Sequence, residues 1–141
     1  MLFESGKRLV VGTDESWESG YGPLRENGLY FGERYDGRLE PTTFKGRTVC
    51  VESLPLRSQM LPPIKVVQRL KPKKTWRPGA KRLLFDFGQN FSGWVGISAR
   101  GRAGTTLTLR HAELIHEEGM LNTSPNQNAE ATDVFVLKGK G

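Results

Sequence analysis

Residues with the chemistry of sugar recognition gather between positions 26 and 38 of the chain. Aromatic rings offer a platform for the C–H face of a sugar, and carboxylate, amide and guanidinium groups bind its hydroxyls. On an extended strand Glu33 and Tyr35 share one face while Asp36 lies on the other, so only one subset can line a pocket. The stretch predicts carbohydrate contacts, with Asn27 and Glu33 as the preferred pair, from a set of Asn27, Glu33, Tyr35, Asp36 and Arg38.

The histidines and the cysteine do not predict a transition-metal site. His111 and His116 are five residues apart, and in one continuous strand an odd separation places them on opposite faces. Cys50 is the single cysteine, so it has no internal disulfide partner, and the alternating run around it is typical of a small buried thiol. Zinc sites use clusters of His and Cys ligands, and no such cluster occurs here.

The composition describes a folded, turn-rich chain. Hydrophobic residues make up 36% of the 141 residues, together with seventeen glycines and eight prolines, a balance that disordered chains lack. The net charge of +6 has a local origin, because eight lysines and arginines fall between Lys65 and Arg82. Such a stretch is typical of a solvated connector. Binding of nucleic acid is the less favoured alternative, since only Trp76 offers a ring for stacking there.

No targeting or anchoring segment is predicted. The start MLFESGKRL lacks the basic-then-apolar order of a signal peptide. No apolar run approaches the roughly 20 residues that a membrane span requires. The cellular location is left open, because a signal can lie outside the sequence given.

Apolar and polar residues alternate with a period of two in many short runs, which predicts an all-β fold. Glycine-rich turns between the runs favour a β-sandwich or jelly roll. The alternation Thr105, Leu107, Leu109 against Thr106, Thr108, Arg110 predicts one core face and one water face, and this strand is expected to form a hairpin with residues 93–100. The expected strands are Arg8–Gly12, Arg34–Glu40, Arg47–Ser53, Ile64–Leu70, Arg82–Phe87, Gly93–Arg100, Thr105–Ile115 and Thr132–Lys138.

The basic, proline-punctuated run KPKKTWRPG predicts a boundary between two parts. We expect a partial amino-terminal sandwich over residues 1–71, a linker over 72–81 and the start of a second sandwich over 82–141. A sandwich needs about seven strands, so the second part is expected to be incomplete. Unpaired strand edges then favour poor solubility or a homodimer. Trp94 and Phe91 are predicted to be core and corner residues rather than a sugar platform.

Two groups of motifs resemble bacterial α-L-rhamnosidases of glycoside hydrolase family 78. The first group, in residues 17–38, is similar to their amino-terminal domain: Trp17, Gly22-Pro23 and Gly32-Glu33-Arg34-Tyr35-Asp36-Gly37-Arg38. The second group is similar to their β-sandwich segment: Asp86 to Asn90, Gly93-Trp94, Arg100-Gly101, Leu109 to Glu113, Ala131-Thr132-Asp133 and Leu137-Lys138-Gly139. Order and spacing agree along most of the chain.

The resemblance implies an accessory, non-catalytic role. In that family an (α/α) barrel after the sandwich performs inverting hydrolysis of terminal α-L-rhamnosyl bonds, which needs two carboxylates about 6.5 to 9.5 Å apart. Here Glu117 and Glu118 are adjacent in a turn, and Asp86 and Glu113 have no acid partner nearby in the sequence. No catalytic residue is therefore assigned. The expected partners are rhamnose-containing glycans and the barrel domain.

The same resemblance implies a candidate site for calcium at Glu26 and Asn27. Some family members hold a sugar-contacting calcium ion with an acidic residue followed by Asn, and Glu26-Asn27 occupies a comparable place. Calcium takes hard oxygen ligands such as these. The alternative is that Asn27-Gly28 simply forms a hairpin turn. A stand-alone lectin-like module that binds sugar without an enzyme is the second functional hypothesis.

Overall fold

A computed structural model describes residues 4–40, 43–49, 51 and 55–139 of the chain. Within these ranges the chain forms ten short strands and two 3-10 turns, and no α-helix. The predicted all-β class is confirmed. In this part of the chain no helix is long and apolar enough to cross a membrane.

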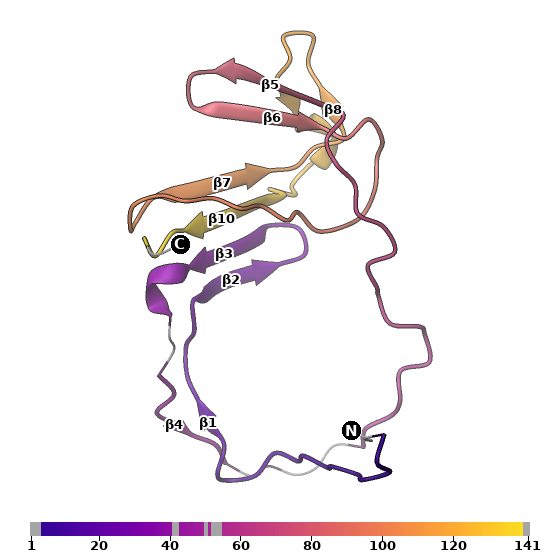
Figure 1. Cartoon of the computed structure of the whole chain (residues 1–141), viewed down its shortest axis with the longest axis vertical. Coiled ribbons are helices and arrows are strands. Elements are labelled where there is room, and N and C mark those ends of the chain that lie inside the picture. Colours follow the sequence, from indigo (N-terminus) through magenta and orange to yellow (C-terminus); the bar gives the residue numbers. More distant parts are fainter. Residues whose placement is uncertain (1–3, 41–42, 50, 52–54, 140–141) are drawn as a thin grey trace.

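A four-stranded sheet is the main element, and both halves of the chain build it (Figure 1). Its order is β2 (Leu24–Gly28), β3 (Gly32–Asp36), β10 (Thr132–Val136) and β7 (Thr106–Arg110). The β2–β3 and β10–β7 pairs are antiparallel, whereas β3 and β10 are parallel. The amino-terminal hairpin therefore joins the carboxy-terminal strands in one hydrogen-bonded layer, where the sequence predicted two separate sandwiches.

The seam between β3 and β10 requires a glycine at its start. Gly32 has a φ of +96°, and a Cβ there would lie 2.3 Å from the Thr132 carbonyl oxygen. Backbone N–H groups of Ala131 and Thr132 donate to the carbonyls of Tyr30 and Phe31 across the same point. Only a residue without a side chain allows this approach, which explains the glycine before the Glu-Arg-Tyr-Asp run.

The predicted alternation along β7 agrees with the structure. Leu107 and Leu109 are half-buried, and Thr106, Thr108 and Arg110 are exposed. The leucines share a face with Phe135, because Leu107 and Phe135 are direct partners in the β7–β10 register. The apolar face of the sheet is thus made by residues more than twenty positions apart.

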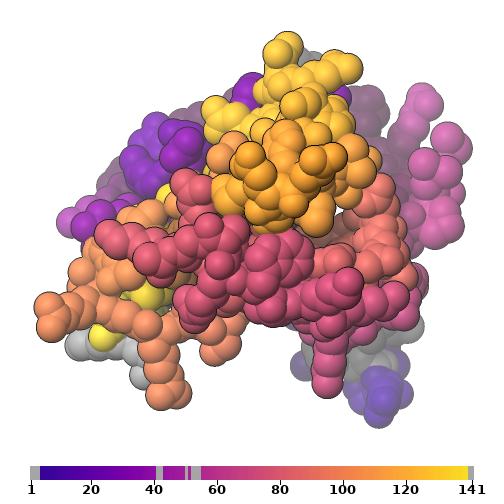
Figure 2. Space-filling model, turned by 90° about the horizontal axis from the view of Figure 1, so that it is seen from above, coloured from indigo at the N-terminus to yellow at the C-terminus, as the bar shows by residue number. Residues whose placement is uncertain are grey.

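A second hairpin lies where the sequence predicted a linker. Residues 74–79 form β5 (Lys74–Gly79), which pairs antiparallel with β6 (Arg82–Asp86). Trp76 and Leu84 are direct partners, Leu84 is buried at 9% exposure, and Trp76 Nε1 donates to the Gly119 carbonyl at 3.0 Å. The contact between these segments is visible from above (Figure 2). The sequence predicted a linker over 72–81 because lysines and prolines dominate this run. They outweighed Trp76, the one apolar residue that indicated a strand.

Shorter elements complete the described chain. β1 (Glu18–Ser19) pairs with β4 (Gly46–Arg47), and β8 (Leu114–Ile115) pairs with β9 (Leu121–Asn122). The 3-10 turns are η1 (Gly37–Leu39) and η2 (Ser124–Asn126). η1 begins directly after β3, so the predicted strand Arg34–Glu40 ends earlier than expected. Likewise β7 and β8 divide the predicted strand Thr105–Ile115.

Three predicted strands are absent from the described residues. Gly93–Arg100 and Ile64–Leu70 run as extended chain without a strand partner, and Arg8–Gly12 contains only a single bridge at Arg8. The predicted hairpin between residues 93–100 and β7 is wrong, because β7 pairs with β10 instead. Trp94 is 71% exposed, so its prediction as a core residue is also wrong. Cys50 and residues 52–54 of the predicted strand Arg47–Ser53 lie outside the described residues.

Candidate functional site

The predicted sugar residues lie on both faces of the β2–β3 hairpin. Asn27 and Glu33 are direct cross-strand partners, so their side chains share one face, and both residues are exposed. Tyr35 lies two residues after Glu33 on that face. Asp36 follows on the opposite face, and Arg38 lies in η1 beyond the end of the strand. The structure therefore brings together Asn27 and Glu33, the preferred pair, but not the whole predicted set.

Tyr35 has a structural environment. Its ring stacks on Phe135 with centroids 4.9 Å apart and planes 7° from parallel. Its hydroxyl donates a hydrogen bond to the Glu40 carboxylate, which raises the pKa of Tyr35 above 10.0. One face of the ring and the hydroxyl are thus already engaged within the protein. Tyr35 holds β3 against β10 rather than offering a free platform to a sugar.

Asp36 and Arg38 satisfy each other. The Asp36 carboxylate accepts from Arg38 Nε at 2.9 Å, from Arg38 Nη2 at 2.7 Å and from the Arg38 backbone N–H at 3.0 Å. The Arg38 side-chain hydrogen bond is the main reason that the pKa of Asp36 falls from 3.8 to about 2. The carboxylate also caps η1. This fork fixes the end of β3, so both residues are engaged in the turn.

Glu26 and Asn27 do not converge on a common point. They are consecutive residues of β2, and consecutive strand side chains point to opposite faces. Glu26 Oε2 lies 2.7 Å from Arg34 Nε, and Arg34 also reaches Glu130 at 3.8 Å. Calcium needs about six to eight oxygen ligands around one centre. The two side chains do not fit such a centre here, so calcium binding stays a prediction that rests on the resemblance.

Asp133 connects the two halves of the sheet and was not predicted as a site residue. Its Oδ1 accepts from the Glu33 backbone N–H at 2.9 Å, and its Oδ2 lies 3.1 Å from His111 Nε2. The Asn126 amide donates to the His111 carbonyl at 3.0 Å. Asp133 belongs to the motif Ala131-Thr132-Asp133 that carries the family resemblance. Its role could not be predicted, because its partner Glu33 is 100 positions away. Its contacts position Glu33 on β3.

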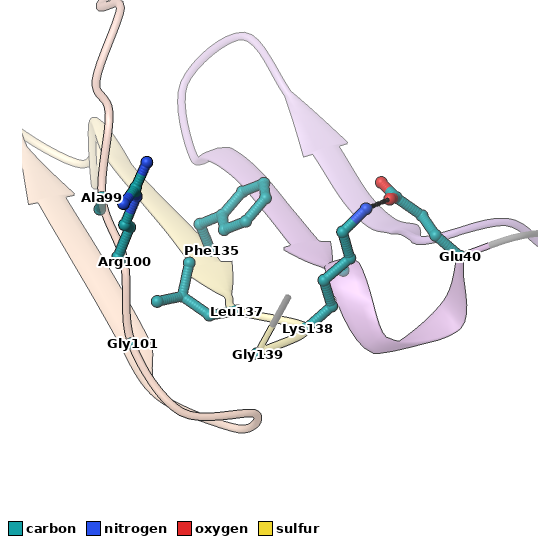
Figure 3. Close-up of a pocket in the computed structure, with 9 residues that line it drawn as sticks. Glu40, Ala99, Arg100, Gly101, Phe135, Leu137, Lys138 and Gly139 are labelled. Carbon is teal, nitrogen blue, oxygen red and sulfur yellow. Dashed lines mark hydrogen bonds and ion pairs between the residues drawn. The ribbon is translucent and has the colours of Figure 1, made fainter. Parts of the chain in front are cut away.

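A small pocket opens between the η1 turn with Glu40, the end of β10 with residues 137–139, and residues 99–101 (Figure 3). It has a volume of about 200 Å³. Its lining includes the charged residues Glu40, Arg100 and Lys138 and the apolar residues Phe135 and Leu137. Lys138 Nζ donates to Glu40 Oε2 at 3.0 Å across the rim. Hydrogen bonds from Tyr35 and Lys138 hold the pKa of Glu40 below 4.5, so its carboxylate stays ionised at neutral pH.

The other acidic residues have local roles in the described chain. Asp86 Oδ1 accepts from the Gly88 backbone N–H at 2.6 Å and so closes the turn after β6. Glu117 and Glu118 are exposed in the turn between β8 and β9. No group of three or more His, Cys, Asp or Glu residues that could hold a metal ion occurs within the described ranges.

Two family models match the chain, one for each half. Residues 1–68 match the α-L-rhamnosidase N-terminal domain, and residues 76–141 match the bacterial α-L-rhamnosidase concanavalin-like domain. The concanavalin-like description agrees with the sandwich class expected from the strand pattern. The matches together account for nearly all of the sequence.

Known proteins that are similar to this chain are α-L-rhamnosidases. An α-L-rhamnosidase of Streptomyces avermitilis is 32% identical over 149 residues, covering 97% of this chain and 14% of that protein. One of an Alteromonas species is 31% identical and covers 96% of this chain and 16% of that protein. The chain therefore spans about one sixth or less of the length of these relatives.

Solved structures agree with this. The α-L-rhamnosidase of Dictyoglumus thermophilum superposes with a TM-score of 0.84 at 38% identity, over 99% of this chain and 17% of that one. The Streptomyces avermitilis enzyme complexed with L-rhamnose gives a TM-score of 0.84 at 28% identity, over 99% of this chain and 15% of that one.

Proposed function

The chain belongs to the bacterial α-L-rhamnosidase family, of which it carries the N-terminal and concanavalin-like domains, and on this premise we propose an accessory, non-catalytic role in hydrolysis of terminal α-L-rhamnosyl bonds. In this role the two domains form a scaffold against which the catalytic barrel packs. A carbohydrate-binding contribution from the β2–β3 hairpin is the second part of the proposal.

The exposed apolar surface is the observation that carries the scaffold role. The chain has an accessible surface of 13,418 Å², whereas a folded monomer of 15.8 kDa has roughly 7,300 Å² by mass scaling. Large apolar side chains stand in water along two extended segments: Ile64, Val66, Val67, Trp94, Val95 and Ile97. Monomeric proteins rarely expose so much apolar surface unless another surface covers it. A neighbouring domain of the same enzyme is the cover that the family relation supports.

A chimeric enzyme tests the scaffold role. This sequence would replace the matching 149-residue stretch of the Streptomyces avermitilis α-L-rhamnosidase. We expect the chimera to hydrolyse an aryl rhamnoside and the isolated 141-residue chain to be inactive. Turnover by the isolated chain would overturn the non-catalytic assignment. A chimera that does not fold, beside a native enzyme that does, would contradict the packing role.

A pair of neighbouring substitutions in the chimera locates the packing surface. Ile97→Asp places a charge where the scaffold role buries an apolar side chain, so we expect lower Tm and a lower yield of active enzyme. Ser98→Asp is the matched control, because it adds the same charge one residue along, at a side chain that is already polar. Equal Tm values for the two variants would argue against burial of Ile97 in the enzyme.

Sugar binding is supported by the position of Asn27 and Glu33. They are exposed and adjacent on one face of the hairpin, an amide beside a carboxylate, which suits paired sugar hydroxyls. L-Rhamnose is the first sugar to titrate, because the Streptomyces avermitilis enzyme was solved with it. Calorimetric titration with and without a calcium chelator separates the possibilities. Heat in neither condition would remove the binding role and leave the scaffold.

A further inference from the structure

The pocket between the η1 turn, the end of β10 and residues 99–101 has the elements of a second ligand site. Its lining shares no residue with the Asn27–Glu33 pair, although Phe135 and its partner Tyr35 lie on the same face of the sheet as that pair. Its volume of about 200 Å³ is smaller than the roughly 300 to 1,000 Å³ typical of pockets for drug-sized ligands. A single sugar ring or a similar small molecule is therefore the size of ligand that it suits.

Phe135 and Leu137 form the apolar floor of the pocket, and contacts within the protein hold both side chains in place. Phe135 stacks on Tyr35 through one face of its ring, and at 37% exposure it still offers surface to a ligand. Leu137 lies beside it, held by backbone hydrogen bonds of 2.8 Å and 2.9 Å that it forms with Thr105 and Gly104. Gly101 packs so closely under Leu137 that a Cβ there would lie 2.9 Å from Leu137 Cδ1. A preorganised apolar floor of this kind suits the C–H face of a sugar.

The charged groups stand on opposite sides of this floor. Figure 3 shows Arg100 on one side and the Glu40–Lys138 pair on the other, with Phe135 and Leu137 between them. Lys138 uses one of its three donors on Glu40, and the Glu40 carboxylate keeps lone pairs for a hydroxyl. Arg100 forms no hydrogen bond or ion pair in the part of the chain that the structure describes. Its fork of donors is open to solvent.

Charge decides the class of ligand. Arg100 and Lys138 supply two positive charges and Glu40 one negative charge, so one positive charge remains on the described lining. A guanidinium with open donors pairs in a bidentate manner with a carboxylate. We propose that this pocket binds a carboxylated monosaccharide of the hexuronic acid type, with its carboxylate on Arg100, a hydroxyl on Glu40 and its ring over Phe135.

The test is a titration of the full chain followed by amide chemical shifts in NMR spectra. Sodium D-glucuronate is the probe, methyl β-D-glucopyranoside is its uncharged counterpart, and acetate is the anion without a ring. We expect glucuronate to shift the amides of residues 99–101 and 135–139 and to bind about 10-fold more tightly than either control, as a charge-assisted hydrogen bond combined with a ring contact implies. Equal affinity for glucuronate and the methyl glucoside, or no shifts with glucuronate, would overturn the proposal.

A matched pair of variants assigns the carboxylate contact. Arg100→Gln removes the guanidinium and should weaken glucuronate binding about 10-fold. Arg102→Gln is the control, because it lies two residues along the same exposed segment, outside the pocket lining, and makes the same change of charge. Equal losses in both variants would mean a diffuse charge effect and not a site. A separate titration with L-rhamnose reports on the hairpin face, so failure of one site is distinguishable from failure of the other.

Discussion

Two segments of the chain have similar alternating sequences and different structures. Residues 106–110, with sequence TLTLR, form β7 at one edge of the four-stranded sheet, with half-buried leucines. Residues 93–100, with sequence GWVGISAR, run as extended chain with Trp94 and Ile97 exposed. The difference is that β7 has β10 as a neighbour along five register positions. The other segment has no strand neighbour in the described chain.

The comparison teaches that alternation selects residues able to form a strand, while a neighbouring edge decides whether a strand forms. A strand forms its ladder of backbone hydrogen bonds only with a second strand. Where that second strand is present, as for β7 and β10, the apolar face also packs against a partner such as Phe135. Where the second strand is absent, as for residues 93–100, apolar side chains such as Trp94 and Ile97 are exposed to solvent.

The largest effect is expected from a substitution at the seam of the sheet. Gly32→Val places a Cβ 2.3 Å from the Thr132 carbonyl oxygen, at a φ of +96°. We expect a loss of about 3 kcal/mol or more in the free energy of unfolding, because both the steric overlap and the backbone strain must be relieved. Urea denaturation measures the loss, and hydrogen exchange shows whether the amides of β3 and β10 lose protection together.

The control lies in the extended segment. A Cβ at Gly96 would meet nothing within 4 Å, so Gly96→Val should change the free energy of unfolding by less than about 0.5 kcal/mol. A comparable loss at Gly96 would show that residues 93–100 pack in solution. The contrast between the two segments would then fail.

A smaller effect is expected from removing the aromatic ring that packs beside β7 and the one in residues 93–100. Phe135→Ala breaks the stack with Tyr35 and uncovers the leucines of β7, so we expect it to cost about 2 kcal/mol. Trp94→Ala removes a larger ring that is 71% exposed, so we expect a change within about 0.5 kcal/mol. The urea midpoints of the two variants give the comparison. A larger cost at Trp94 would reverse the assignment of core and surface.

The sequence predicted those strands whose own alternation of apolar and polar residues is enough to identify them. The all-β class, the two faces of β7 and the strands β6 and β10 follow from local alternation. The parallel pairing of β3 with β10 does not, because their residues are about 100 positions apart and no local signal specifies which edges meet. β5 was missed for a different reason. Only Trp76 and Pro78 of β5 are half-buried, and Trp76 packs over a turn more than forty residues later.

The candidate site shows the same limit. Asn27 and Glu33 were predicted together, and a two-strand hairpin brings them together because the turn between them is local. Tyr35, Asp36 and Arg38 were predicted from residue type, but their hydrogen bonds belong to the protein itself. Lys138 and Phe135 were missed as pocket residues because their partners Glu40 and Tyr35 belong to the other half of the chain. Residue type indicates what a side chain can bind, and long-range pairing decides what remains open for a ligand.

The smallest effect concerns pH and compares a carboxylate at the end of the sheet with one in the turn at residues 14–17. The Arg38 guanidinium lowers the pKa of Asp36 from 3.8 to about 2, whereas the Ser16 hydroxyl and backbone N–H lower the pKa of Asp14. A carboxyl group with a lowered pKa in the folded state stabilises the protein above its unfolded pKa, and this contribution disappears as the pH falls from about 4 through about 2. Asp14 is exposed, and the half-buried Asp36 pairs with an exposed arginine at the surface, so the change in stability is small and the pKa itself is the better measurement.

Arg38→Gln should therefore return the pKa of Asp36 toward 3.8 and leave that of Asp14 unchanged, while Ser16→Ala should raise only the pKa of Asp14. Side-chain carboxyl carbon shifts followed from pH 6 to about pH 1.5 give both titrations in one experiment, in a range that brackets the two carboxylates. Each carboxylate has its hydrogen-bond partner two residues away along the chain. Local hydrogen bonds of this kind need no neighbouring strand, so Asp14 should keep its lowered pKa in the turn at residues 14–17. An Asp14 that titrates at its ordinary pKa would show that local order, like the strands, depends on the sheet.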